Sequence, residues 1–162
     1  MNAISIRNIF PKDKTWIQTL ALESWGNEKV VVCGRVFDLT VLAGVVAEIN
    51  GERSGLATYI IDGATCEVIT LNSLQSGLGV GSQLLDAVAQ RAGEQKCKLL
   101  TLFTTNDNIN ALRFYQKYGF HLAALIPNGV EADRKIKPEL PQRGENGIPI
   151  RDYLELRMEL KA

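Results

Sequence analysis

The order of apolar and turn-forming segments predicts a mixed α/β fold, in which helices flank a central mixed sheet. Apolar residues make up 46% and charged residues 22% of the 162 residues, as in ordinary globular proteins, and this length suits one domain over residues 1–162. Periodicity predicts the order β, α, a three-strand antiparallel meander, α, β, α, β, a long loop and β. A regular βαβ array would give a different order.

The first half of the chain supplies a strand, a helix and the meander. Ile4 and Ile6 alternate with polar residues, which predicts a short first strand. A helix is expected to begin at Pro11 and to end near Gly26. The meander is predicted as strands 45–49, 56–61 and 66–74, joined by turns at 50–55 and 62–63.

Residues 29–44 are harder to interpret. Val30 to Val32 suit a strand because they are β-branched, whereas residues 37–44 suit a loop that covers part of the molecule.

The second half continues with helices and strands in alternation. Leu84, Leu85, Val88, Ala89 and Ala92 form one apolar stripe of a helix that runs to about residue 95. The remaining elements are predicted as a buried strand 99–104, a helix 109–118, a strand 121–126, a loop 127–150 and a closing strand 152–160.

Charge and cysteine content restrict the partners and the compartment. Eighteen basic and eighteen acidic residues cancel, so no overall charge favours nucleic acid or an anionic membrane. The longest uncharged stretch, 68–85, is too polar to span a bilayer. Three cysteines without a CxxC or Cys/His cluster support neither a metal site nor disulfides. Residues 1–14 lack the pattern of a secretion signal, so we expect a cytoplasmic protein.

Three glycines within five residues form the most informative local feature. Gly77, Gly79 and Gly81 follow a strand and precede a helix, so backbone N–H groups and the helix dipole could together bind a phosphate or pyrophosphate. A tight turn without a ligand is the alternative. Ser82 stands where a dinucleotide fingerprint needs glycine, and no lysine follows Gly81 as a Walker loop requires.

The glycine loop and a second motif further along the chain resemble those of the GNAT superfamily of N-acetyltransferases. Gly79 and Gly81 match the two small positions of that family's [Q/R]-x-x-G-x-[G/A] loop. The second motif, N-x-x-A-x-x-[F/L]-Y-x-x-x-G-F, is matched by Asn108, Ala111, Phe114, Tyr115, Gly119 and Phe120. The resemblance covers about residues 45–126, and a closing strand at 152–160 also fits it.

The resemblance implies a sheet of six to seven strands, splayed between the fourth and fifth, with acetyl-CoA in the gap as co-substrate and no metal. The pantetheine arm would pair with the backbone of Ile69, Thr70 and Leu71. The pyrophosphate would lie on Ser76, Gly77, Leu78, Gly79, Val80, Gly81 and Ser82, and Asn108 and Ala111 would also contact the cofactor. Asn108 could instead act only as a helix N-cap.

The implied reaction is direct attack of a primary amine on the thioester in a ternary complex. A lysine-like amine of pKa about 10.4 must lose a proton, which costs roughly 4 to 5 kcal/mol at pH 7. Glu67 is the candidate base, directly or through water, and an exposed strand carboxylate without this role is its alternative. Tyr115 is the candidate acid for the departing thiolate, and core packing is its alternative.

One departure from the motif leaves other functions open. Ser76 stands where the family has Gln or Arg, which removes a long side chain near the pyrophosphate. A non-catalytic CoA-binding or regulatory module of the same fold is therefore an alternative, and a structural domain without a CoA site is another.

The acceptor is a small-molecule or peptide amine that the sequence does not specify. Five basic and five acidic residues balance in the loop before the last strand. Trp16 or Trp25 could line an acceptor pocket or pack in the core. The loop could also serve as a lid or an oligomer contact, which would allow a homodimer.

Overall fold

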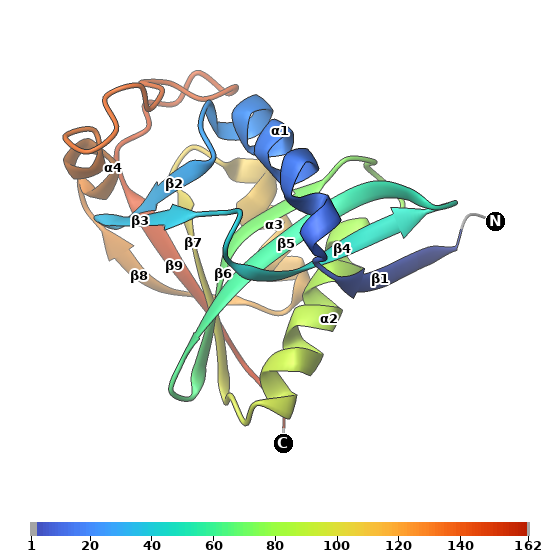
Figure 1. Cartoon of the computed structure of the whole chain (residues 1–162). Helices are drawn as coiled ribbons and strands as arrows, with labels where there is room; N and C mark the ends of the chain where they lie inside the picture. The colour runs from blue at the N-terminus through green and yellow to red at the C-terminus, as the bar shows by residue number, and fades with distance from the viewer. Residues whose placement is uncertain (1–2, 162) are drawn as a thin grey trace. The chain divides into compact units, whose positions relative to one another are not determined.

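The computed structural model describes residues 3–161 and confirms the mixed α/β class (Figure 1). A seven-stranded mixed sheet flanked by helices contains β1, β4, β5 and β6 in one compact unit and β7, β8 and β9 in another. The first unit comprises the chain up to Glu28, Asp38–Leu100 and the chain from Glu159. The second comprises Lys29–Phe37 and Thr101–Met158.

The sheet of the first unit is antiparallel throughout, in the order β1-β4-β5-β6. Its strands are β1 (Ile4–Asn8), β4 (Ala43–Ile49), β5 (Glu52–Asp62) and β6 (Thr65–Ser73). The β4–β5 turn is tighter than expected because Asn50 and Gly51 both adopt positive φ, which suits a two-residue hairpin with the right strand twist. The meander therefore has the predicted order with longer strands.

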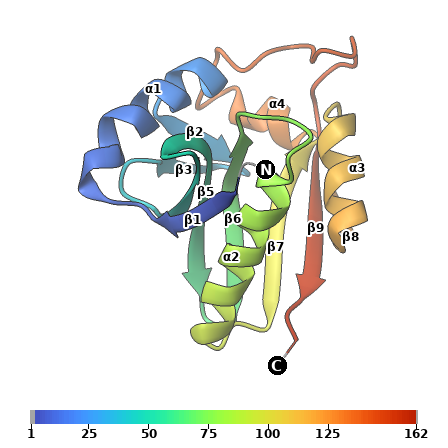
Figure 2. The same cartoon turned by 90° about the vertical axis from the view of Figure 1, so that its right-hand side faces the viewer.

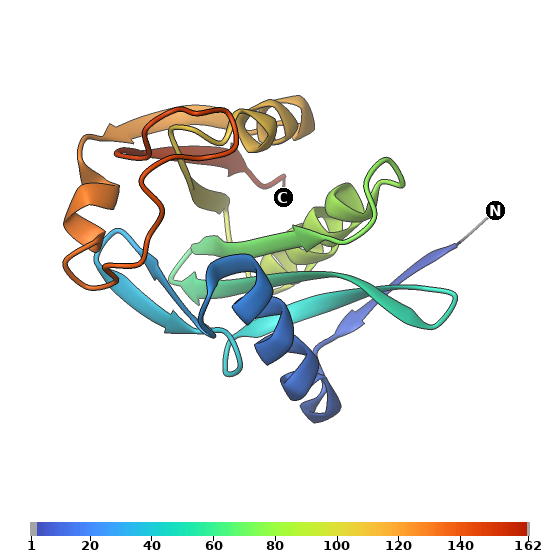
Figure 3. The same ribbon diagram turned by 90° about the horizontal axis from the view of Figure 1, so that it is seen from above.

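Two helices cover opposite faces of this antiparallel sheet (Figure 3). A 3-10 turn, η1 (Pro11–Asp13), leads into α1 (Lys14–Trp25), which buries Ile17, Leu20 and Ala21 and ends at Gly26. The other helix, α2 (Val80–Glu94), packs on β4, β5 and β6 through its predicted apolar stripe. A Cβ at Gly55 would lie 2.7 Å from Val80 Cγ1, which shows how closely α2 approaches β5.

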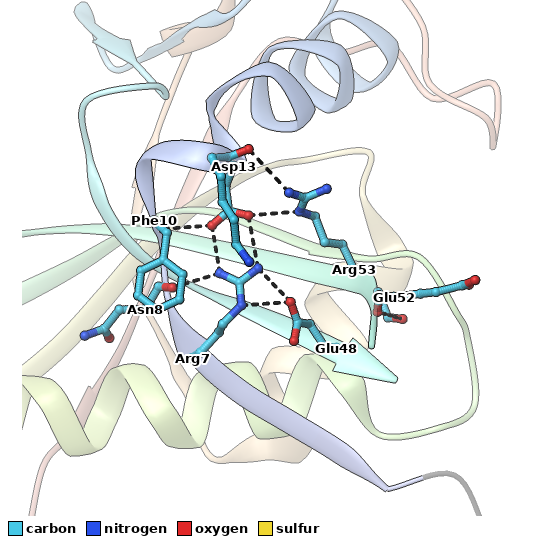
Figure 4. A network of polar contacts seen from close by, with 9 residues as sticks. Arg7, Asn8, Phe10, Asp13, Glu48, Glu52 and Arg53 are labelled. Atoms are coloured by element: carbon cyan, nitrogen blue, oxygen red, sulfur yellow. Dashed lines mark hydrogen bonds and ion pairs between the residues drawn. The ribbon is translucent and has the colours of Figure 1, made fainter. Parts of the chain in front are cut away.

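A buried carboxylate ties the start of α1 to the sheet (Figure 4). Asp13 is fully buried and accepts hydrogen bonds from the guanidinium groups of Arg7 on β1 and Arg53 on β5, at 2.7 and 2.9 Å for the shortest contacts. The Phe10 backbone N–H donates to the same carboxylate at 2.7 Å. These donors hold the pKa of Asp13 well below its usual range.

The second unit contains the other three sheet strands in the order β7-β9-β8. They are β7 (Leu99–Thr105), β9 (Tyr153–Glu159) and β8 (His121–Ile126), with β8 antiparallel to β9. Helix α3 (Ile109–Tyr118) packs against β8 (Figure 2). The predicted strands and the predicted helix at 109–118 are therefore present.

Two elements of the second unit differ from the prediction. Residues 37 and 38, expected to belong to a covering loop over 37–44, lie in β3 (Arg35–Asp38), which pairs with β2 (Lys29–Val32). Cys33 and Gly34 form the turn between them at φ 49° and 77°. Glycine suits this conformation but cysteine rarely adopts it, so the pair was not recognised as a hairpin turn. The expected loop 127–150 contains a short helix, α4 (Gly129–Asp133).

The structure of residues 3–161 shows the state of the cysteines and whether any helix could span a membrane. All three cysteines are free thiols, with Cys66 and Cys97 buried and Cys33 half-buried. Burial raises the pKa of Cys66 to about 12, so this thiol stays protonated at neutral pH. Over the same residues, the structure has no helix that is both long and apolar enough to cross a membrane.

Candidate active site

The glycine loop leads directly into the N-terminus of α2 (Figure 2). Gly77 and Gly79 have φ of 79° and 80°, a left-handed conformation that favours glycine. Gly79 is the N-cap, and its carbonyl accepts the first helical hydrogen bond, from Gln83 N–H at 3.1 Å. Leu74 N–H donates to Ser54 O at 2.9 Å and anchors the start of the loop to β5.

The N-terminus of α2 presents backbone N–H groups that no side chain caps. The first N–H groups of a helix have no intrahelical acceptor, and here the N-cap is a glycine without a side chain to satisfy them. The first turn carries no acidic residue that would repel an anion. Residues 73–79 are exposed, whereas Val80 is buried and fixes the helix. The predicted residues Ser76 to Ser82 thus form one accessible loop and helix end.

A bulge determines which side chains of β6 share a face. Leu56, Thr58 and Ile60 alternate along β5, so their partners Asn72, Thr70 and Glu67 lie on one side of the sheet. This arrangement is possible because β6 contains one extra residue, Ile69, opposite the step from Thr58 to Tyr59. Simple alternation along β6 would have placed Glu67 on the opposite face from Thr70 and Asn72.

This face of β6 is polar and lies toward α1. The hydroxyls of Thr58 and Thr70 share a hydrogen bond of 2.6 Å in the interior. Asn72 Nδ2 donates to Ser24 Oγ in the last turn of α1 at 3.2 Å. The candidate base Glu67 is half-buried on the same face. The first unit therefore combines the glycine loop with a polar strand face directly before it.

The second unit carries the motif around α3. Asn108 is the N-cap of α3, and its side chain accepts a hydrogen bond from Ala111 N–H at 3.2 Å. Asn108 thus acts as a helix N-cap through its side-chain oxygen, and its amide nitrogen is not used by this cap. Ala111 lies half-buried in the first turn.

Tyr115 belongs to an aromatic cluster at the end of α3. Its ring contacts Phe114 and Phe120 edge-on, with centroids 5.4 and 5.6 Å apart, whereas the packing alternative expected Phe114 and Tyr118 as its neighbours. Burial raises the pKa of Tyr115 to about 12. The phenol therefore remains protonated, and able to donate a hydrogen bond, over the whole physiological range.

Sequence reasoning missed a set of polar residues that fix the loop before β9. Asn106, directly after β7, accepts hydrogen bonds from the N–H groups of Arg151 and Asp152 at 2.9 and 3.0 Å and donates to Pro149 O. The buried Arg134 donates to Leu140 O, Pro141 O and Ile150 O. These hydrogen bonds tie the loop to the end of β7 and to its own backbone.

A large groove in the first unit lies away from the glycine loop. It measures about 1070 Å³ and is bounded by α2 from Gln83 onward and by β1, β4 and β5. Its lining lacks the glycine loop and the β6 residues Ile69 to Leu71. Within residues 3–161, no group of three or more His, Cys, Asp or Glu is placed to hold a metal ion.

Comparison with known proteins identifies the family. The model of the acetyltransferase (GNAT) family matches residues 6–120, which include the glycine loop and the α3 motif. The chain belongs to the GNAT family of acetyltransferases. Two uncharacterized proteins of Bacillus subtilis (strain 168) are similar to this GNAT protein. YdhI is 44% identical over 80% of this chain and 82% of its own length, and YxbD is 39% identical over 93% and 94%.

Solved GNAT structures share the fold over almost the whole chain. An acetyltransferase from Elizabethkingia anophelis with acetyl-CoA bound has 27% identity and a TM-score of 0.71, over 97% of this chain and 98% of that one. The IAA acetyltransferase of Bacillus cereus ATCC 14579 has 22% identity and a TM-score of 0.75, over 98% and 100%. The latter likeness concerns the fold alone.

Proposed function

We propose that this GNAT protein transfers the acetyl group of acetyl-CoA to a primary amine. The observation that carries the proposal is the glycine-capped N-terminus of α2, which offers backbone donors and a positive helix end to a pyrophosphate. Family membership and the relative with bound acetyl-CoA support the same cofactor. Ser76 adds only a short side chain, so the backbone supplies most of the anion binding.

The proposed chemistry is direct acyl transfer. The amine nitrogen attacks the thioester carbonyl carbon, the new C–N bond forms, and the C–S bond breaks with its electron pair on sulfur. Glu67, directly or through water, accepts the proton that the amine loses. The pantetheine arm pairs with the backbone of Ile69 to Leu71, next to the bulge of β6.

Tyr115 acts on the leaving sulfur in this proposal. A phenol of pKa about 12 is a weaker acid than an ordinary thiol of pKa about 8.5, so complete proton transfer to the thiolate is uphill. We therefore assign Tyr115 the role of a hydrogen-bond donor that stabilises the developing negative charge. The thiolate then takes its proton from the protonated base or from water.

A panel of amines tests the function. Ethanolamine, spermidine, lysine amide and a peptide with a free N-terminus are incubated with the protein and acetyl-CoA, while free CoA thiol is followed. We expect amine-dependent thiol release with at least one of them. CoA binding that stabilises the protein, about 2.7 kcal/mol at a hundredfold excess over Kd, without any release would favour the non-catalytic module instead.

Substitution of Gly79 tests the anion site separately from the chemistry. Gly79→Ala places a Cβ on a residue at φ 80°, which costs roughly 1 kcal/mol of backbone strain. Relief of this strain should reorient the N–H groups at the start of α2. We therefore expect about tenfold weaker CoA binding, measured by calorimetric titration. Gly51→Ala is a matched control, because Gly51 also has φ 80° and open space around its Cα. Equal CoA affinity of the two variants would contradict the site.

A further inference from the structure

One buried polar atom in the first unit has no hydrogen-bond partner. Among residues 3–161, the side-chain oxygen Oδ1 of Asn72 is the one buried side-chain nitrogen or oxygen atom without a partner. The Nδ2 atom of the same amide donates to Ser24 Oγ. Asn72 therefore uses one half of its amide to contact α1 and leaves the other half unused.

A buried acceptor without a partner is best explained by a ligand that binds it. Buried polar side-chain atoms are nearly always hydrogen-bonded, because burial removes their water partners without replacement. A leucine at this position would have a similar branched shape and no such cost. Asn72 is therefore better explained by a group that the Oδ1 atom binds during function than by packing.

The surroundings of Asn72 fit an acceptor substrate. Asn72 follows the segment Ile69 to Leu71, which we assign to the cofactor, and it shares the α1-facing side of β6 with Glu67. The last turn of α1 contributes no buried residue, and Leu22 is 57% exposed. The 3.2 Å contact to Ser24 is a hydrogen bond between exposed groups and uses only the Nδ2 side of the amide, so it does not compete for the Oδ1 atom.

Spacing along the strand indicates which part of the acceptor reaches Asn72. The β5 partners of Glu67 and Asn72 are Ile60 and Leu56, four residues apart, so the two Cα positions on β6 are about 13 Å apart. One nitrogen cannot contact both side chains across that span. If Glu67 serves the reacting nitrogen, Asn72 meets a second N–H donor of the same molecule.

We propose that Asn72 is a specificity-determining residue whose Oδ1 atom accepts a hydrogen bond from a second ammonium or amide N–H group of the acceptor amine. This inference rests on the proposed acetyl transfer. It assigns the acceptor to extended diamines and peptide amines rather than to simple monoamines. Asn72 positions the acceptor and takes no part in bond making.

A matched pair of substrates tests the inference. Putrescine and n-butylamine have the same four-carbon chain, but only putrescine has a second ammonium group. Wild type should acetylate putrescine with at least tenfold higher kcat/KM, mainly through a lower KM. Asn72→Leu should abolish this preference and leave the KM for acetyl-CoA unchanged. Asn72→Asp retains an acceptor oxygen at this position, adds a second, and should preserve the preference.

Thermal unfolding supplies a readout that does not depend on activity. Asn72→Leu removes the unsatisfied acceptor, so its melting temperature should equal or exceed that of wild type. Asn8→Leu is the matched control, because Asn8 Oδ1 already accepts a 2.7 Å hydrogen bond from Arg91 Nε. The control should lower the melting temperature and keep the diamine preference. A lower melting temperature for Asn72→Leu with unchanged substrate preference would overturn the inference.

Failure of the inference can be distinguished from failure of the proposed function. If neither amine is acetylated by wild type, calorimetric titration of putrescine into the CoA-loaded protein decides the matter. Binding by wild type that is lost in Asn72→Leu supports Asn72 as the acceptor contact, even though transfer to these amines fails. Equal binding by both proteins, or no binding by wild type, overturns it.

Discussion

Replacement of Tyr115 by phenylalanine is expected to lower kcat about 10²–10³-fold, the usual cost of removing one hydrogen-bond donor from a developing anion. The aromatic contacts with Phe114 and Phe120 need only the ring, so the variant should fold normally. CoA affinity should stay within about twofold of wild type, because the proposed anion site is at the N-terminus of α2. Steady-state kinetics with the best amine of the panel, together with CoA titration, provide the measurement.

Tyr118 offers a matched control in the same helix and the same aromatic cluster. Its ring packs on Phe114 and Phe120, and Tyr118→Phe makes the same chemical change three residues away. This variant should retain wild-type kcat. Equal kcat for Tyr115→Phe, Tyr118→Phe and wild type would remove Tyr115 from the mechanism.

The raised pKa of Tyr115 makes a related prediction about pH. Because the phenol has a pKa of about 12, it should not lose its proton between pH 8 and pH 10. Deprotonation of Tyr115 should therefore not lower wild-type kcat between pH 8 and pH 10. Any decrease of kcat in this range should also be seen in Tyr115→Phe. A decrease with an apparent pKa near 9 that is specific to Tyr115 would contradict the buried environment of the phenol.

Replacement of Asp13 by asparagine is expected to cause the largest loss of stability, about 3 kcal/mol at pH 7. The fully buried carboxylate balances Arg7 and Arg53, and both guanidinium groups lose their shared partner in the variant (Figure 4). Glu48→Gln is the control, because Glu48 pairs with the same Arg7 at a more exposed position and should cost only about 0–1 kcal/mol. Urea unfolding measures both changes.

Acid should weaken the wild type through the same group. The folded-state pKa of Asp13 lies below its unfolded value, so its stabilisation is present above about pH 4 and is lost as pH falls through the folded pKa. Asp13→Asn lacks this titration, and its stability should depend less on pH below pH 4. Parallel pH dependences for the two proteins would show that Asp13 does not carry this stabilisation.

Much of the fold was predictable because its signals are local. The alternation in the meander and the apolar stripe of α2 each report burial directly, and the elements lie where the sequence places them. The β2–β3 hairpin was missed because its turn places Cys33 rather than asparagine or aspartate before Gly34, with both residues at positive φ. Helix α4 was missed because five residues are too few to show a helical period.

The part of the candidate site that depends on unusual backbone conformations was predictable, because such conformations favour glycine. Gly77 and Gly79 adopt the left-handed conformations that a glycine-rich loop suggests. The face of Glu67 was not predictable, since it depends on a one-residue bulge at Ile69 that exists only in the pairing with β5. Asn72 was missed because its unpartnered Oδ1 atom is apparent only from the three-dimensional packing around the amide. The sequence does not show which atoms of an asparagine side chain have hydrogen-bond partners.

The most direct test of the proposed function follows the acetyl group itself. Wild type is incubated with acetyl-CoA that carries carbon-13 in the acetyl group and with the best amine of the panel, and the products are analysed by mass spectrometry. We predict one labelled N-acetyl group on the amine for each CoA thiol released, at a rate proportional to protein concentration. Thiol release without labelled amine, or CoA binding without release, would contradict acetyl transfer to an amine.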